Sequence, residues 1–342
     1  MKKKIVVRMP NWLGDAVMAT PVLHDLKTAM PDAHCTVLCH EAIANLLQHN
    51  PYIDNFLIFS REKKRTHAEK ARIFSQLQTQ SFDIGILLTR SFSSAWWFYK
   101  GHVRKRIGFC DHFRSLLLTD GLKIKDTEES EHQVITYKRL LDPLKIMRST
   151  TAPELFLQDQ ERKNARALLQ KEGICDHHKI IGVNPGAAFG SAKCWPPEYF
   201  VELAKRFQSE PNTRLIFFSD TPGKPLVDDI CEKCPTNTVN LANKTNLRSL
   251  LALISECHAF LSNDSGPMHV AAALKTPLIA LFGSTNDVKT GPYGKATVIH
   301  KHVACSPCYK RSCPIDFRCM KSITVDEVVH AIQGVFSCPR PN

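Results

Sequence analysis

The segment from Phe260 to Asp287 brings an acid, a hydroxyl, a glycine and a histidine to the point where an apolar run passes into a helical pattern. Asp264, Ser265 and Gly266 stand at the start of the expected helix, and His269 follows about one turn later. Free backbone N–H groups and the helix dipole at such a start favour anions such as phosphate. Asp264 suits a sugar or ribose hydroxyl better, and His269 alone also fits a packed core histidine. Together the four residues predict a cradle for a nucleotide diphosphate that carries a sugar.

A second segment rich in glycine and small residues, "NPGAAFGSAKCWP", contains a single cation, Lys193. A lysine after such a turn can neutralise a diphosphate as a point charge. An ordinary surface lysine would give the same sequence. The segment does not match the GxxxxGK[ST] phosphate loop, and no GxGxxG follows any expected strand. The pattern therefore disfavours an ordinary ATPase or an NAD-dependent enzyme.

The first apolar run of the chain is followed by "MPNWLGDAVMATP". Gly14 permits a tight turn, and Asp15 falls where the next helix should begin. Asp is favoured as a helix N-cap, so Asp15 has a purely structural interpretation. A carboxylate on a loop of this kind can equally act as a general base if it reaches a substrate hydroxyl.

Apolar runs of strand length alternate with helical patterns, which is typical of parallel sheets with crossover helices. The runs are nearly continuous, so both faces of each sheet should be covered. The expected strands lie within residues 4–8, 35–39, 55–59 and 82–88 of the first half and 179–186, 214–220, 259–264 and 277–283 of the second. Helices are expected between them, for example over 16–30 and 68–80. In such sheets ligands bind beyond the carboxyl ends of the strands, where the polar segments above all lie.

The periodicity breaks near residues 147–161, and 342 residues exceed what one core usually supports. The pattern predicts an α/β protein with two Rossmann-like, doubly wound domains that face a cleft. A capping box of Thr324 and Glu327 predicts a terminal helix. The expected division is 1–155 for the first domain, 156–322 for the second, and 323–342 for a C-terminal helix and tail.

The composition, with 43% hydrophobic and 23% charged residues, is typical of a soluble globular protein. No run approaches the roughly 18 apolar residues of a membrane span, and the apolar part of "MKKKIVVRMPNWLGD" is too short for a signal peptide. We therefore expect a cytoplasmic protein.

The formal net charge of +12 and the runs Arg61–Arg65 and Lys100–Arg106 suit an anionic partner. That partner could be nucleic acid, a phosphorylated lipid or an acidic membrane face, and a solvated basic surface is the simplest alternative. A nucleic-acid module should interleave basic and aromatic residues, and only Trp96 and Trp97 near the second run hint at this.

Thirteen cysteines in a cytosolic chain argue against a disulfide framework. Cys305, Cys308, Cys313 and Cys319 are spaced C-x2-C-x4-C-x5-C, and four thiolates at such spacing could hold a structural zinc ion. The second C-x2-C of a zinc ribbon is missing, so packed or free cysteines in an ordered loop are the alternative.

Three segments together resemble the signature regions of the ADP-heptose:lipopolysaccharide heptosyltransferases, most closely the heptosyltransferase II type. They are "NWLGDAVMATPVLHDLK", "NPGAAFGSAKCWP" and "NDSGPMHVAAALKTPLIALFG", and "CSPCYKRSCPIDFRCM" is a further family-like segment. The resemblance extends from Ile5 to about Gly294. The segment Phe217–Pro225 departs from relatives, which often have glycine and an acidic residue near the adenosine, so the contact to the base is not predicted.

The resemblance implies an inverting glycosyltransferase of the GT-B fold, with the acceptor bound by the first half and ADP-heptose by the second. Asp15 would be the catalytic base, Lys193 would contact the diphosphate, and the donor loop and helix would supply Asp264, Ser265, Gly266 and His269. Candidate acceptor-binding residues are Asn11, Gly14, Arg104, Lys105 and Arg106. No cofactor is required for this chemistry.

The implied acceptor is the lipopolysaccharide inner core, heptosyl-Kdo-lipid A, and the implied location is the inner face of the cytoplasmic membrane, with the protein peripherally bound and monomeric. A related transferase with another nucleotide sugar or core position is the alternative within the class. A basic nucleic-acid- or metal-binding protein is the alternative outside it.

Overall fold

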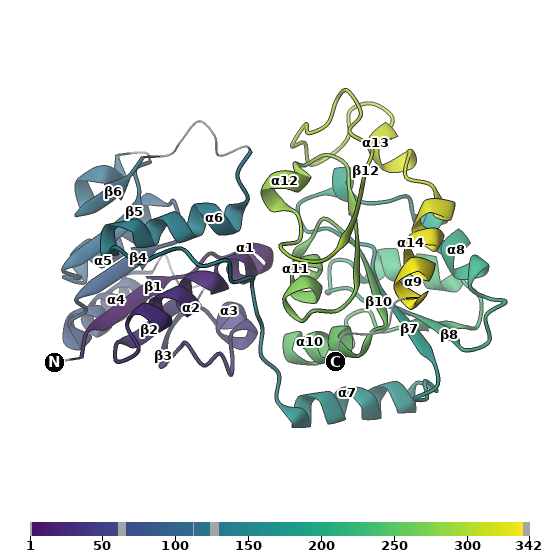
Figure 1. Cartoon of the computed structure of the whole chain (residues 1–342), viewed down its shortest axis with the longest axis horizontal. Helices are drawn as coiled ribbons and strands as arrows, with labels where there is room; N and C mark the ends of the chain where they lie inside the picture. The colour runs from purple at the N-terminus through teal and green to yellow at the C-terminus, as the bar shows by residue number, and fades with distance from the viewer. Residues whose placement is uncertain (1, 61–65, 112, 124–129, 338–342) are drawn as a thin grey trace. The chain divides into compact units, whose positions relative to one another are not determined.

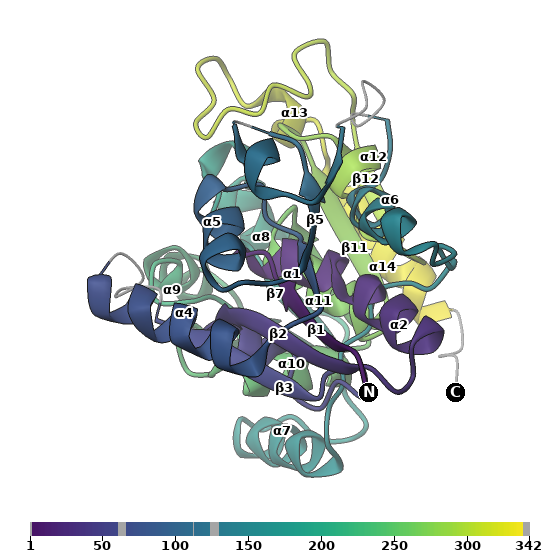
Figure 2. The same ribbon diagram turned by 90° about the vertical axis from the view of Figure 1, so that its left-hand side faces the viewer.

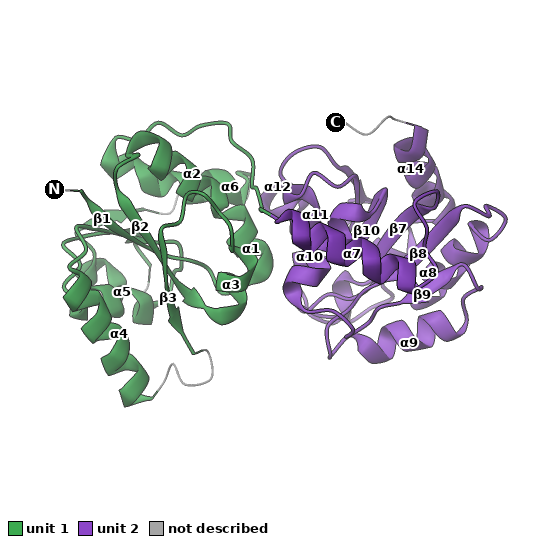
Figure 3. Ribbon diagram, turned by 90° about the horizontal axis from the view of Figure 1, so that it is seen from below, with its two compact units in different colours: residues 1–156 green, residues 157–342 purple. Residues whose placement is uncertain are grey.

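The computed structural model describes residues 2–60, 66–111, 113–123 and 130–337, and the chain divides into two compact units, Met1–Phe156 and Leu157–Asn342 (Figures 1 and 3). The basic run Arg61–Arg65 lies outside the described residues. Within the described part, no helix is both long enough and apolar enough to cross a bilayer.

The first unit is built on a six-stranded sheet in the order β3-β2-β1-β4-β5-β6, with every neighbouring pair parallel. Its strands are β1 (Lys4–Arg8), β2 (His34–His40), β3 (Asn55–Phe59), β4 (Ile84–Leu87), β5 (Lys105–Phe109) and β6 (Asp120–Leu122). Its helices are α1 (Leu13–Met18), α2 (Thr20–Ala29), α3 (Glu41–Leu46), α4 (His67–Gln80), α5 (Phe92–Lys100) and α6 (Gln133–Lys138), with 3-10 turns at Arg114–Leu117 and Arg139–Leu144. Figure 2 shows α4 and α5 on one face of this sheet and α2 and α6 on the other.

The second unit repeats this plan in the order β12-β11-β10-β7-β8-β9, again with all pairs parallel. Its strands are β7 (Lys179–Asn184), β8 (Thr213–Phe217), β9 (Thr238–Asn240), β10 (Ala259–Asn263), β11 (Leu278–Phe282) and β12 (Thr297–His300). Its helices are α7 (Asp159–Lys171), α8 (Pro197–Arg206), α9 (Lys224–Glu232), α10 (Leu247–Glu256), α11 (Gly266–Ala273), α12 (Asp287–Thr290), α13 (Arg318–Lys321) and α14 (Val325–Ser337), with a 3-10 turn at Ser191–Lys193. Because the order reverses between β1 and β4 and between β7 and β10, each sheet has one switch point, where ligands bind in such folds.

The cores explain why both sheets are covered on each face. In the second unit, α8, α9 and α14 bury an apolar cluster that includes Trp195, Phe200 and Ile332 against one face. The predicted capping box is confirmed: Glu327 N–H donates to the Thr324 hydroxyl, and the Glu327 carboxylate accepts from Thr324 N–H. The helix expected over residues 16–30 is instead two helices, because α1 ends at Met18 and Pro21 lies in the first turn of α2. The predicted fold class, two Rossmann-like doubly wound parallel sheets, is confirmed.

Candidate active site

The loops that follow β7 and β10 carry the predicted donor residues, and these two strands flank the switch point of the second sheet. The β7 loop ends in the 3-10 turn that contains Lys193, and Asp264 follows β10 directly. Because both strands are parallel neighbours, their carboxyl ends lie at the same edge. The topology therefore brings together two segments that are far apart in the sequence.

The ammonium group of Lys193 donates to Asp264 Oδ2 in a short ion pair, and the Thr285 hydroxyl donates to the same oxygen at 2.6 Å. Both charged side chains are largely buried, with 13% of Lys193 and 5% of Asp264 exposed. A buried carboxylate with two donors is held in one orientation. The structure thus fixes the position of one cation at the edge where a diphosphate would bind.

A network of side-chain amides joins the two loops. Asn263 Nδ2 donates to Pro185 O at 2.6 Å, and its Oδ1 accepts from Trp195 N at 3.1 Å. Asn184 Nδ2 donates to the Ser265 hydroxyl at 3.0 Å. Each buried asparagine side chain therefore crosses from one strand end to the loop of the other, which makes the edge rigid.

Ser265 and His269 belong to the start of α11. Ser265 is the N-cap residue by its backbone, but its hydroxyl makes no capping bond because it interacts with Asn184 and Ser262. The helix begins at Gly266 with a proline in its first turn, as the sequence predicts. His269 is 6% exposed, and it lies on the same helix about one turn beyond Ser265. A buried position fits a packed core histidine and equally fits a residue that lines the donor pocket.

A third segment reaches this site from the cysteine-rich loop. Two cations lie close to the phenyl ring of Phe189, with Lys193 Nζ 4.9 Å and Arg311 Cζ 5.4 Å from its centroid. Arg311 O accepts from Ala192 N at 3.0 Å, and Gly190 has a φ of 155°. A Cβ at Gly190 would lie 2.2 Å from Arg311 O, so only glycine permits this approach. The loop thus adds a second cation beside Lys193.

Asp15 lies beyond the carboxyl end of β1, at the switch point of the first sheet. Helix α1 begins at Leu13 and its N-cap is Trp12, so Asp15 is in the first turn and the N-cap interpretation is wrong. Burial raises the pKa of Tyr137 well above its usual value, and the negative charge of Asp15 adds to that rise while Arg90 opposes it. Asp15 therefore shares its surroundings with a buried phenol and an arginine.

The loop before Asp15 is held by buried polar contacts. Arg8 Nη2 donates to Asn11 Oδ1 at 2.8 Å, and Asn11 O lies 3.0 Å from His40 Nε2. Burial lowers the pKa of Arg8 to about 10. Gly14 lies within α1, directly before Asp15, so the tight turn expected at this glycine is wrong. Asn11 is thus a residue that shapes the loop in this structure.

Known proteins that are similar to this chain share one family and one fold. The sequence profile of glycosyltransferase family 9 (heptosyltransferase) matches residues 70–317. The lipooligosaccharide heptosyltransferase 2 of Campylobacter jejuni subsp. jejuni serotype O:2 is 30% identical over 342 residues, which covers 97% of this chain and 98% of that protein. The lipopolysaccharide heptosyltransferase 2 of Escherichia coli K12 is 30% identical over 306 residues, 86% of this chain and 87% of that protein. The solved structure of E. coli ADP-heptose lipopolysaccharide heptosyltransferase II matches with a TM-score of 0.84 at 26% identity, covering 98% and 99% of the two chains.

The chain belongs to glycosyltransferase family 9. It is therefore a glycosyltransferase, and its two doubly wound units are those of the GT-B fold.

One group of predicted acceptor residues in this family 9 enzyme lies away from Asp15. Arg104 precedes β5, and Lys105 and Arg106 are its first two residues, so they lie at the amino edge of the sheet. Five strand residues span about 16 Å, and Asp15 lies at the carboxyl edge. Arg104 pairs with Asp83 at 3.3 Å and Lys105 with Asp120 at 3.3 Å. These three residues thus lie at the opposite edge of the sheet from Asp15, and their part in binding the acceptor stays a prediction.

The four-cysteine segment does not form a metal centre in this structure. Cys305 is exposed and Cys319 is buried, while Cys308 and Cys313 are intermediate. Zn–S bonds of about 2.3 Å require sulfurs within about 4 Å of one another. Among the described residues, no three of these sulfurs lie within 4.8 Å of each other. As placed in this structure, the four sulfurs are too far apart for a four-cysteine zinc site, and a bound zinc ion stays a prediction.

Several site residues of the family 9 enzyme escaped the sequence reasoning. Thr285 follows an expected strand, so the rule that ligands lie after strand ends could have found it. Arg311 lies within the cysteine-rich segment, and nothing local indicates that it folds back onto the β7 loop. Tyr137 and Arg90 belong to no recognisable sequence motif, and they come near Asp15 only in the folded chain.

Proposed function

We propose that this glycosyltransferase transfers a heptose from ADP-L-glycero-β-D-manno-heptose to the inner core of lipopolysaccharide, with inversion, as a heptosyltransferase of type II. The observation that carries the proposal is the buried Lys193–Asp264–Thr285 group at the switch point of the second sheet. It presents a fixed cation where the diphosphate of a nucleotide sugar would bind. The heptosyltransferase 2 names of relatives at about 30% identity support transfer of a heptose to lipopolysaccharide.

The donor diphosphate would lie between Lys193, Arg311 and the start of α11 at Gly266. Two cations and free helix N–H groups stabilise the negative charge that grows on the departing ADP. Asp264 would act chiefly by orienting Lys193, since its Oδ2 already accepts from Lys193 and Thr285. Ser265 and His269 would complete the donor pocket from the same helix.

On the acceptor side, Asp15 would take the proton of the attacking hydroxyl as the oxygen bonds to the anomeric carbon. General base catalysis of this kind contributes about 10²–10⁴ in rate. Tyr137 stays a neutral phenol because its pKa is raised, so it can donate a hydrogen bond but carries no charge near the reacting centre. Asn11 would shape the loop before α1, Gly14 would leave space beside Asp15 in the first turn of that helix, and Arg90 would supply positive charge for a phosphorylated core sugar.

The direct test incubates purified protein with ADP-heptose and a panel of truncated lipopolysaccharide acceptors. We expect transfer to an acceptor that ends in the first core heptose, heptosyl-Kdo-lipid A, and no transfer to Kdo-lipid A alone. Other nucleotide sugars are tested as donors for comparison with ADP-heptose. Faster transfer from one of them, or to another core position, would replace the type II proposal by the alternative transferase.

We further place the enzyme, as a monomer, at the inner face of the cytoplasmic membrane, with α5 and its neighbourhood as the contact surface. Phe92, Trp96 and Tyr99 are 49%, 36% and 45% exposed on α5. The adjoining 3-10 turn and the residue before it add Leu116 and Phe113, which are more than four-fifths exposed. Exposed aromatic and apolar side chains of this kind insert into the interfacial region of a bilayer.

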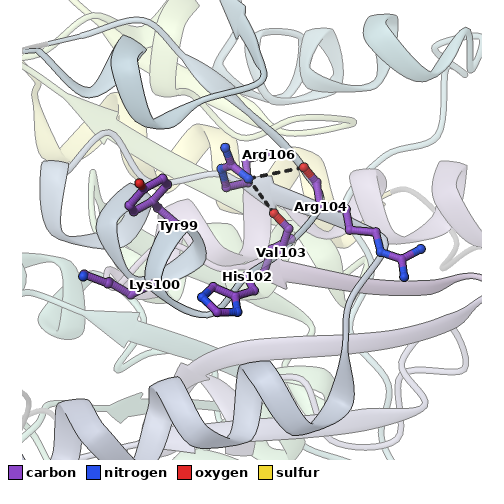
Figure 4. A pocket seen from close by; sticks show the side chains of 6 residues that line it. All are labelled: Tyr99, Lys100, His102, Val103, Arg104 and Arg106. Carbon is purple, nitrogen blue, oxygen red and sulfur yellow. Dashed lines mark hydrogen bonds between the residues drawn. The ribbon is translucent and has the colours of Figure 1, made fainter.

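Basic groups accompany these aromatic residues. Lys100 Nζ lies 4.9 Å from the Trp96 ring centroid, and Arg106 Cζ lies 5.6 Å from that of Tyr99. Beside them is a hollow of about 340 Å³ lined by Tyr99, Lys100, His102, Val103, Arg104 and Arg106 (Figure 4). In Figure 4, Arg106 is held by the carbonyls of Val103 and Arg104, whereas the guanidinium of Arg104 points away from the hollow. The hollow is thus large enough for a phosphate-bearing lipid head group, and cationic side chains line it.

Co-sedimentation with vesicles tests the membrane proposal. Anionic vesicles should bind the protein, neutral vesicles should bind it weakly, and rising salt should release it because exposed charges are screened over about 8–10 Å. Lys100→Ala with Arg104→Ala should reduce binding several-fold. Lys224→Ala with Lys233→Ala removes two exposed, ion-paired lysines at the two ends of α9 and is the matched control. Equal loss in both double variants, or tighter binding to single-stranded RNA than to vesicles, would contradict the proposal.

A further inference from the structure

Asp287, His300 and His302 form a compact group at the carboxyl edge of the second sheet. Asp287 is the first residue of α12, His300 is the last residue of β12, and His302 follows two residues later. His300 Nδ1 lies 2.9 Å from Asp287 Oδ1, and His302 Nε2 lies 3.7 Å from Asp287 Oδ2. One ligand atom from each residue lies within 4.8 Å of the other two. The imidazole rings themselves are 3.9 Å apart between centroids.

The proton on His300 can be placed from its neighbours. The Ser306 hydroxyl donates to the carbonyl oxygen of Gly283, which can only accept. Ser306 Oγ has a single hydrogen, so it must accept the bond from His300 Nε2, which is 2.9 Å away. Nε2 of His300 therefore carries a proton. In the neutral ring, the lone pair of Nδ1 then points at the carboxylate of Asp287.

A lone pair facing a carboxylate oxygen at 2.9 Å is repulsive unless a positive charge lies between or on them. The side chain of His300 is 2% exposed, so water does not screen this repulsion. His302 adds a second imidazole nitrogen to the same carboxylate and is 66% exposed, so the group is reachable from solvent. Two imidazole nitrogens and one carboxylate oxygen thus converge where a positive charge is required, either a metal ion or a second proton on the His300 ring.

We propose that Asp287, His300 and His302 bind a divalent first-row transition-metal ion. Bonds of about 2.0–2.2 Å in a tetrahedral site place ligand atoms about 3.3 Å apart. The nitrogens of His300 and His302 lie 2.9 Å from Oδ1 and 3.7 Å from Oδ2 of Asp287, close to that value. Imidazole and carboxylate ligands suit Zn²⁺, Fe²⁺, Co²⁺ and Ni²⁺. The bond from His300 to Ser306 is the outer contact that fixes the tautomer of a metal-bound histidine.

The site would tie the β11 loop to the segment that follows β12. Ser306 already bonds Gly283, and the backbone N–H groups of Cys308 and Tyr309 donate to Ser284 O at 3.1 and 2.8 Å. Thr285, which holds Asp264, lies in the same loop. The metal is therefore structural for the donor site: it contacts no reacting atom, and its loss should weaken donor binding without changing the chemical step.

The test titrates chelator-treated protein, free of any histidine tag, with Co²⁺ and Zn²⁺, followed by visible absorption and calorimetry. We expect one ion per chain, a visible Co²⁺ spectrum without thiolate charge-transfer bands, and a rise in Tm on binding. His302→Ala alters an exposed side chain and should fold normally, yet lower the affinity at least about 10-fold. His177→Ala is the matched control, because His177 and His178 form a similar ring pair at 4.1 Å but, among the described residues, belong to no group of three potential metal ligands.

Three outcomes would overturn the site. Absence of saturable binding of either ion would leave His300 as a buried imidazolium paired with Asp287. Thiolate bands that disappear in Cys308→Ser would move the ion to the cysteines. Unchanged affinity in both His302→Ala and Asp287→Asn would place it elsewhere.

Discussion

Lys193 and Asp264, which are 71 residues apart in the sequence, form a buried ion pair at the switch point of the second sheet. Sequence reasoning assigns them separate tasks, the diphosphate to Lys193 and a hydroxyl to Asp264. The structure couples them, because the carboxylate is the group that holds the ammonium in place. Removing one partner of a buried pair leaves the other uncompensated, which costs more than the pair contributes. The two residues should therefore behave as one unit.

We expect Lys193→Ala and Asp264→Asn each to weaken ADP binding at least about 10-fold, since a buried pair is strongly destabilised by loss of either partner. Lys193→Ala removes the charge, whereas Asp264→Asn keeps the size of the side chain but releases the lysine. Because the residues are coupled, the double variant should lose much less than the product of the two single losses. Calorimetric titration with ADP gives the three affinities. Additive losses would show that Asp264 contacts the donor independently of Lys193.

Asp15→Asn should lower kcat by about 10²–10⁴ and leave the affinity for ADP within a few-fold, because it removes a base without changing shape. Tyr137→Phe is the comparison variant, since it removes only a neutral hydroxyl near Asp15, and its loss should be smaller. Single-turnover kinetics at saturating acceptor and donor measure both. Turnover above about a tenth of the wild-type value in Asp15→Asn would exclude the base assignment.

Gly190→Ala should disturb the donor loop, because the new methyl group would meet Arg311 O at 2.2 Å and φ there is 155°. We expect a loss of about 1–3 kcal/mol in the free energy of unfolding and weaker ADP binding as Arg311 shifts. Gly186→Ala is the control in the same loop, since no atom lies within 4 Å of the place its methyl group would take and its φ is not positive. Urea unfolding of both variants measures the difference in stability. Equal stabilities would mean that the loop can move away from the new methyl group at no cost in free energy.

The central strands of both sheets were predictable because each is an unbroken apolar run bounded by turn residues. Strands β5, β6, β9 and β12 were not, although the edge strand β3 was expected over its full length. Strand β5 begins with Lys105 and Arg106, which the sequence presents as part of a basic run, and β6 and β9 have only three residues each. Such strands form because they pair with a neighbouring strand, and the local sequence does not show which strand that neighbour is.

The candidate site shows the same limit. Lys193 and Asp264 could be found because each follows a recognisable strand. The approach of Arg311 to Phe189, and of Tyr137 to Asp15, depends on loops that fold back over long separations. No periodicity or motif encodes such contacts, so side chains held only by tertiary structure were missed.

The last prediction concerns the acid stability of the first unit. Asp25 is 3% exposed and accepts from the Ser149 hydroxyl at 2.5 Å, and Lys138 Nζ lies 3.4 Å from its other oxygen. Burial alone would raise the pKa of Asp25, but the hydrogen bonds from Ser149 and His24 and the charge of Lys138 outweigh it, so the pKa lies below its ordinary value.

A carboxylate with a depressed pKa stabilises the fold fully above its unfolded pKa of about 3.9, and this contribution is lost as the pH falls through the lower, folded value. We therefore expect the free energy of unfolding of the wild type to decline on acidification below about pH 4, in part through Asp25. Asp25→Asn should be destabilised at about pH 7, because Lys138 is left buried without its partner, and its stability should depend less on pH in the acid range. Asp228→Asn is the control, since Asp228 also has a lowered pKa but lies at the surface. Urea titrations between about pH 3 and 7, a range that spans the ordinary carboxyl pKa, decide it: an acid slope in Asp25→Asn as steep as in the wild type would assign the decline to other carboxylates.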